Sequence, residues 1–457
     1  MVLDEWTGEI DASFARAVVD RLDAIAALGS ERRSGSAAGP RPADPAGAPE
    51  PPWMDAEPVE QRLGEAVDSL LRLEGSAARI AEEARRVAAG GGDARRAWSV
   101  ALLLGCAPGD DAAEAAAGTL RSPRMDLRAA ATEAIALGRS PAIGPALARL
   151  AEDATPAACA AALEALRFRR EAALAPCVVL LGHPDALVAA AAARCLATVP
   201  ERKAAAVVLR RVLGDDPEEA VAVAAAEGLL SLGDAASLSF VRGELSAESA
   251  SPSLSDGARV AYLRLLALGG DAEDLELFFR SLEASPRDAL AVGWFGHPDL
   301  IDWLIGSLET ANEARRNGPR GRASAPSLLG PSAFEIAAAQ ALGRIAGAPE
   351  GVPAPGLEAS AWRAWWSRAR ARFTSGQKHR FGKPYAPEAT IDELTSPAMA
   401  SVRADAALEL AIVSAGSASV ETADWVARQR AVIAAARETI ATAPWPPGTF
   451  PGRRLSR

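Results

Sequence analysis

Histidine and cysteine, the side chains that most often bind metals or act as nucleophiles, are few in this chain and widely spaced. There are three histidines, at positions 183, 297 and 379, and four cysteines, at positions 106, 159, 177 and 195. A histidine metal site needs a cluster of ligands, and no two cysteines have the spacing of a zinc site. We therefore expect no bound metal and no cofactor, with the thiols buried and reduced as in a cytoplasmic protein.

Other residues that could do chemistry have a structural interpretation that the sequence favours. His183 and His297 share the context Gly-His-Pro-Asp. They could be paired ligands or a general base, but a proline followed by a helix-capping aspartate is typical of a turn between helices. Glu133, Glu164 and Glu409 fall on predicted helices, and we expect them to face solvent and not to act as acid–base pairs. The chain has neither a phosphate-binding loop nor a nucleophile elbow, which favours a protein that is not an enzyme.

An aromatic and basic segment near the C-terminus is the best candidate for contact with another molecule. Trp362, Trp365 and Trp366 precede a basic run that contains Arg380. Tryptophan and arginine are enriched at the energetic centres of protein interfaces. The spacing of the tryptophans also suits a helix that buries one face, and for them the core is the favoured interpretation. We take these four residues as the candidate partner-binding site.

The elements that would position these residues are repeated helices. A helix with a small-residue face, often ending in glycine, recurs along the chain. Four clear copies are RRAWSVALLLG at 95–105, LRAAATEAIALG at 127–138, ARVAYLRLLALG at 258–269 and VRADAALELAIV at 402–413. The matching arginines are Arg95, Arg128, Arg259 and Arg403. We expect the terminal glycines to form left-handed caps, and the arginines to make ion pairs or caps between repeats, with an anion-binding ridge as the alternative.

A second amphipathic helix follows each first helix, so the repeating unit is a helix pair of about 30 residues. Neither helix can bury its apolar face alone, and stacked units share one core. The sequence thus predicts an all-α fold, an α-solenoid in which the helix pairs form a superhelix. We divide the chain into an N-terminal helical segment at 1–28, a flexible linker at 29–58, the solenoid at 59–346, and a C-terminal helical segment at 347–457.

Composition narrows the possible partners. The 457 residues include 49 Lys and Arg against 59 Asp and Glu, a net charge of −10. This balance makes nucleic acid an unlikely main partner, although arginine-rich stretches at 315–322 and 368–383 keep DNA as a weaker alternative. No apolar run approaches the roughly 18 residues of a membrane-spanning helix. The acidic start, Met1 to Glu5, is unlike a signal peptide, so we expect a cytoplasmic protein without membrane insertion.

The repeats at 94–345 and 391–441 resemble the short HEAT-like repeats that also occur in phycobilin lyases. The Trp-rich helix, the RFGKPY sequence and the VRADAALELAI helix are similar to an uncharacterised bacterial family of HEAT-repeat proteins, some of whose members occur near type VI secretion genes. The resemblance implies a non-enzymatic adaptor or scaffold whose curved surface holds another protein. The alternative is a lyase-like or ligand-handling helical-repeat protein with a small-molecule groove.

Overall fold

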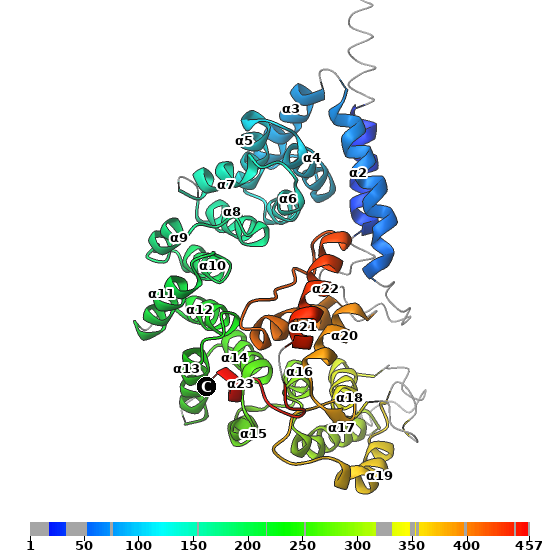
Figure 1. Ribbon diagram of the computed structural model, residues 1–457. Helices are drawn as coiled ribbons and strands as arrows, with labels where there is room; N and C mark the ends of the chain where they lie inside the picture. Colours follow the sequence, from blue (N-terminus) through cyan, green and yellow to red (C-terminus); the bar gives the residue numbers. More distant parts are fainter. Residues whose placement is uncertain are drawn as a thin grey trace, which may run out of the picture.

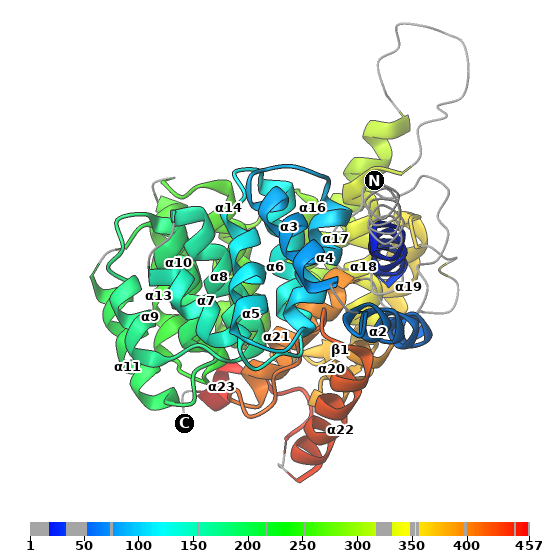
Figure 2. The same cartoon turned by 90° about the horizontal axis from the view of Figure 1, so that it is seen from above.

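The structure is a computed structural model that describes residues 18–32, 53–73, 76–152, 155–215, 217–250, 253–316, 331–347, 352, 356–396, 400–442 and 445–455. Pairs of antiparallel helices stack into a curved solenoid, which confirms the predicted all-α helical-repeat fold (Figure 1). Seen from above, the helices of the repeats stand side by side in a curved row (Figure 2). No helix among the described residues is both long and apolar enough to cross a lipid bilayer.

The solenoid has two layers of helices. The inner helices, which pack on one another in sequence and line the concave side, are α4 (Ala94–Cys106), α6 (Met125–Leu137), α8 (Pro156–Arg169), α10 (Ala186–Leu196), α12 (Glu219–Ser231), α14 (Asp256–Gly269), α16 (Pro286–Phe295) and α18 (Ala333–Ala346). The outer helices are α3 (Ser76–Ala88), α5 (Asp110–Gly118), α7 (Ile143–Glu152), α9 (Leu174–Leu180), α11 (Arg202–Gly214), α13 (Ala236–Ala250), α15 (Leu275–Ser281) and α17 (Ile301–Arg316). Short 3-10 turns precede or follow several of them: η2 (Thr119–Arg121), η3 (Ala272–Asp274) and η4 (Pro298–Leu300).

Alanine and glycine let the inner helices approach closely. A methyl group built on Gly138, just after α6, would lie 2.5 Å from the carbonyl oxygen of Gly105 in α4. One built on Gly293 of α16 would lie 2.8 Å from Cα of Ala341 in α18. Gly233, after α12, does have a positive φ, but the predicted left-handed caps are wrong for Gly105, Gly138 and Gly269, none of which has one. These glycines are required by the contact between neighbouring helices.

The N-terminal boundaries differ from those predicted. Residues 18–32 are helical, so this helix runs four residues into the stretch assigned to a flexible linker. At the other end of that stretch, η1 (Trp53–Ala56) and α2 (Glu57–Leu71) begin before residue 58. The rest of the predicted linker, and residues 1–17, lie outside the described residues. Helix 18–32 buries Val18, Leu22 and Ile25 in the main hydrophobic core and is therefore an integral part of the fold.

The C-terminal segment folds back into the concave side of the solenoid. It contains α19 (Ala359–Ala369), η5 (Arg370–Arg372), a short antiparallel pair β1 (His379–Arg380) and β2 (Lys383–Pro384), α20 (Pro387–Thr395), α21 (Ala400–Val413), α22 (Val426–Thr442) and α23 (Gly452–Leu455). Helix α21 packs against α12 and α14, and α22 packs against α2 and η1. In Figure 1 these orange and red helices lie inside the arc, so they do not simply extend the stack as a further repeat.

Candidate functional site

Charged side chains on consecutive inner helices pair with one another along the concave face. Arg194 of α10 donates to Glu164 of α8 at 2.6 Å. Two repeats further on, Arg264 of α14 donates to Glu227 of α12 at 3.2 Å and to Asp405 of α21 at 2.6 Å. The sequence analysis expected Glu164 to face solvent, but in the structure its carboxylate is paired with Arg194. These ion pairs join neighbouring repeats and connect them to the C-terminal segment.

A loop of the C-terminal segment, residues 414–425, connects α21 to α22 along this face, and we call it the crossing segment. It consists mainly of turns and bends that are closed by local backbone hydrogen bonds. Two arginines of the repeats donate to its main chain. Arg202 of α11 donates to the carbonyl oxygen of Ala415, and Arg170, which caps α8, donates to that of Ser419. The concave face thus holds a loop through bonds to main-chain carbonyls, which a loop of another protein can offer as well.

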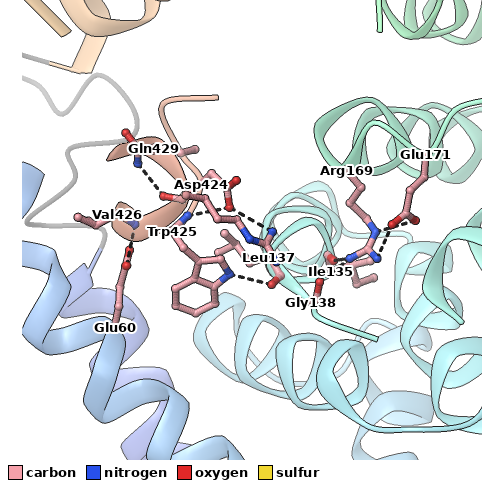
Figure 3. A network of polar contacts seen from close by, with 12 residues as sticks. Glu60, Ile135, Leu137, Gly138, Arg169, Glu171, Asp424, Trp425, Val426 and Gln429 are labelled. Carbon is pink, nitrogen blue, oxygen red and sulfur yellow. Dashed lines mark hydrogen bonds and ion pairs between the residues drawn. The ribbon is translucent and has the colours of Figure 1, made fainter. Parts of the chain in front are cut away.

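Side chains of the crossing segment add two further contacts. Glu421 accepts a bond from Arg167 of α8 at 3.3 Å. Trp425 donates from its indole Nε1 to the carbonyl oxygen of Leu137, at the end of α6, at 3.0 Å (Figure 3). The crossing segment therefore contacts the repeats from α6 to α12.

The end of the crossing segment is fixed to the N-terminal helices. Glu60 of α2 accepts from the backbone N–H of Val426 at 2.8 Å (Figure 3) and from Nε of Arg32 at 2.9 Å. Arg32 also donates to the carbonyl oxygens of Ala423 and Asp424, at 2.8 and 3.0 Å. Burial raises the pKa of Glu60, although Arg32 opposes this effect. The N-terminal helices and the end of the crossing segment therefore contact each other and close the arc.

A cavity of about 450 Å³ lies between the inner helices, α21 and the crossing segment. Its charged lining consists of Arg167, Arg170, Arg194, Arg202, Arg264, Glu227 and Glu421. Its apolar lining includes Val199, Leu408, Ala411 and Val420. The cavity thus combines a cluster of guanidinium groups with an apolar wall, the combination of surfaces found in ligand pockets.

Burial and neighbouring charges act in opposite directions on the pKa of Arg167 and on that of Glu421. Burial raises the pKa of Glu421, and the nearby Arg167 only partly offsets this. Burial alone would lower the pKa of Arg167, but the carboxylates of Glu421 and Glu164 outweigh it and raise that pKa. Arg167 therefore stays charged, while Glu421 is the carboxylate of this cavity that takes up a proton more easily than usual.

The structure places the predicted partner-binding tryptophans in the core. Trp362, Trp365 and Trp366 of α19 are only 2%, 6% and 3% exposed. The indole Nε1 of Trp362 donates to the carbonyl oxygen of Gly356 at 2.7 Å, and the rings of Trp365 and Trp366 pack against Phe373. The prediction that these tryptophans bind a partner is therefore corrected. Their i, i+3 and i+4 spacing serves to bury one helix face.

Arg380 is also buried, in a network that the sequence analysis missed. It donates to Glu409 at 2.9 Å and pairs with Glu393, while Lys378 donates to Glu409 at 2.7 Å. Thr390 donates to the other oxygen of Glu409 at 2.6 Å. Arg380 therefore offers no surface to a partner, and the expectation that Glu409 faces solvent is wrong.

The pKa values of this network follow from its burial and charges. Burial would raise the pKa of Glu409, but Arg380 and Lys378 outweigh it and hold that pKa at about 2. Burial lowers the pKa of Lys378 to about 8, although Glu409 opposes this effect. The guanidinium groups of Arg344 and Arg380 both lie over the ring of Trp294, 3.7 and 4.6 Å from its centre. The network anchors the β1–β2 hairpin between the solenoid and the C-terminal helices.

The two Gly-His-Pro-Asp motifs form turns, as the sequence favoured. Nδ1 of His183 accepts from the backbone N–H of Asp185 at 3.0 Å, and Nδ1 of His297 accepts from that of Asp299 at 3.2 Å. Burial lowers the pKa of His297. Within the described residues, no group of three or more His, Cys, Asp or Glu side chains is arranged to hold a metal ion.

Three of the four repeated arginines make contacts within and between repeats. Arg259 pairs with Asp288 of α16 at 3.2 Å, and Arg403 donates to the carbonyl oxygen of Leu394 at 3.1 Å. Arg128 donates to the carbonyl oxygen of Ser122 at 2.7 Å. The fourth, Arg95, is exposed. These contacts support the structural interpretation and not a ridge that binds anions. The arginines of the cavity occupy other helix positions, and no local pattern in the sequence marks them.

Compared with models of protein families and with curated proteins, the chain matches none. Its fold and its charged concave face define it as a helical-repeat solenoid whose inner surface holds a loop of its own chain.

Proposed function

We propose that this protein is a non-enzymatic adaptor or scaffold that holds a loop of another protein on its concave face in the cytoplasm. The crossing segment carries this proposal. The repeats hold it through Arg170 and Arg202, which donate to main-chain carbonyls, and through Arg167, which pairs with an acidic side chain. The concave face of a solenoid is the surface that such proteins use for binding, and the partner's chemistry would be that of a loop with acidic residues.

The bonding pattern supports this proposal over binding at the outer helices. Bonds from charged donors are stronger than bonds between neutral groups, and the inner face supplies guanidinium donors from successive repeats. A partner segment would either lie beside the crossing segment or take its place. The proposed link to type VI secretion and the HEAT-like assignment rest on the resemblance of the sequence alone.

Photo-crosslinking in the native host tests the proposal. A photoreactive phenylalanine analogue replaces Ala404, which is exposed and lines the concave cavity. The matched control carries the same group at Arg211 of the outer helix α11, whose side chain is 85% exposed. We expect the first variant to capture the same protein reproducibly and the control not to capture it. Capture at Arg211 alone, or no reproducible protein at Ala404, would contradict the proposal.

A small-molecule function has one observation in its favour, the cavity beneath the crossing segment. Its volume of about 450 Å³ falls in the range of roughly 300–1,000 Å³ that is typical of ligand sites. The same solenoid could therefore hold a small ligand with or without a protein partner.

A further inference from the structure

We propose that the arginine-lined cavity is a binding site for a small organic anion, with a phosphate or carboxylate head group on an apolar body. This site shares its arginines with the face proposed to hold a protein loop, but it takes a different ligand, and neither proposal depends on the other. The argument rests on the charge of the cavity, on two arginines that form no ion pair with a described residue, and on the apolar wall.

The carboxylates around the cavity do not balance its arginines. Five arginines and two glutamates line it. Two more carboxylates, Glu164 and Asp405, pair with these arginines from beside the lining. Five positive charges against four negative charges leave an excess of one positive charge, which a ligand with one or two negative charges would neutralise.

The excess charge belongs to Arg170 and Arg202. Neither forms an ion pair with any described residue, and each donates only to main-chain carbonyls. A guanidinium group carries five N–H donors in a planar fork that matches the oxygens of a phosphate or carboxylate. Both arginines line the same cavity, so one anion can engage both.

Two left-handed helix caps place these groups beside the cavity. Arg170, with a φ of 56°, caps α8, and Ala415, with a φ of 47°, follows the end of α21. Both caps are closed locally, since the N–H of Glu171 donates to the carbonyl of Leu166 and that of Gly416 to the carbonyl of Ala411. The second cap presents the carbonyl of Ala415 to Arg202, and Gly416 lines the cavity.

The rest of the lining indicates an apolar body on the ligand. Val199, Leu408, Ala411 and Val420 form part of the wall, so an inorganic ion would leave this surface exposed to water. Covering this apolar surface favours binding because it removes the surface from contact with water. The head group would therefore give orientation, and the body would add affinity.

Titration calorimetry on the full chain tests the site with defined probes. Hexyl phosphate and hexanoate combine each head group with a six-carbon body, and inorganic phosphate and hexanol each carry one half of that chemistry. We expect saturable binding of hexyl phosphate, of hexanoate or of both, and binding at least about tenfold weaker for inorganic phosphate and hexanol. The stronger of the first two identifies the head group.

Substitutions locate the bound anion. Arg170→Gln with Arg202→Gln keeps an N–H donor for each carbonyl but removes both charges, and should weaken binding about tenfold or more. The control Arg211→Gln removes an exposed arginine from the same helix as Arg202 and should leave binding unchanged. The proposal is overturned if neither six-carbon anion binds saturably, if inorganic phosphate binds as tightly, or if the double variant binds as the wild type does. Each of these results leaves the crosslinking test of a protein partner unaffected.

Discussion

Removing the negative charge of Glu409 should destabilise the protein strongly, because this carboxylate compensates two buried cations. In the wild type it binds Lys378 at 2.7 Å and Arg380 at 2.9 Å, and all three side chains are buried. Glu409→Gln keeps the shape of the side chain but leaves these cations with Glu393 as the remaining acid. Breaking a buried ion pair from one side costs about 3–5 kcal/mol.

The pKa of Glu409 gives a second measure of this effect. It falls from 4.5 to about 2 in the folded protein. At about 1.4 kcal/mol for each pH unit, the ionised carboxylate contributes roughly 3 kcal/mol. Because this folded-state pKa is depressed, the contribution is present above pH 4.5 and is lost as the pH falls towards 2. The two magnitudes agree.

The loss in Glu409→Gln should also depend on pH, through Lys378. The pKa of Lys378 is already lowered to about 8, and Glu409 raises it against the effect of burial. In the variant it falls further, so the folded state releases a proton that the unfolded state keeps up to about pH 10. Stability then rises with pH over this interval. The stability gap to the wild type should shrink from pH 6 to pH 8, by up to about 1.4 kcal/mol per pH unit.

Urea unfolding at pH 6, 7 and 8, followed by circular dichroism and tryptophan fluorescence, measures this gap. Thr390→Val is the control, since it removes the hydrogen bonds of this hydroxyl with Glu409 and Tyr385 but no charge, and should cost about 1–3 kcal/mol with little change between pH 6 and pH 8. Replacing the pair together, as Lys378→Met with Glu409→Leu, should be less destabilising than Glu409→Gln. A loss below about 1 kcal/mol in Glu409→Gln, or a gap that stays constant or widens with pH, would refute the reasoning.

Three further changes test the packing. Gly138→Ala should destabilise the protein by about 1–3 kcal/mol because its methyl group would meet Gly105. The control Gly214→Ala places its methyl group where nothing lies within 4 Å, and should leave the urea midpoint unchanged or slightly raised. Trp362→Ala should lower the free energy of unfolding by about 3–5 kcal/mol in the same assay, and a loss near zero would contradict the burial of this side chain. A thiol reagent should label Cys106 quickly and the three buried cysteines only after unfolding; four equally fast thiols would contradict the burial.

The repeat pattern in the sequence was sufficient to predict the helix pairs. Small residues every three or four positions, as in the helix that ends at Gly138, can bury one helix face only against another helix, so the local pattern already requires stacking. The turn role of His183 and His297 was also predictable, because proline and aspartate beside them have strong local preferences.

The candidate site was not predictable, because it is made by contacts between distant parts of the chain. Arg170 meets Ser419 and Arg202 meets Ala415, more than 200 residues apart. No local pattern encodes these pairs. The partners of Glu409 could not be predicted for the same reason. Its helix resembles the other repeat helices, but its side chain is buried against Lys378 and Arg380, at the β1–β2 hairpin. Trp362 was ambiguous for a related reason, since helical spacing marks a buried face without showing whether the chain or a partner covers it.

The amino-acid sequence by itself determined the helices, their pairing and the curved stack, because hydrophobic periodicity and close-packed small residues act over one or two turns of helix. Only the tertiary structure decided that the C-terminal segment lies inside the arc, and therefore which charges are buried and which line a cavity. The physical reason is that the energy of a charge depends on its partners and on its access to water, and both are set by where the chain returns in space.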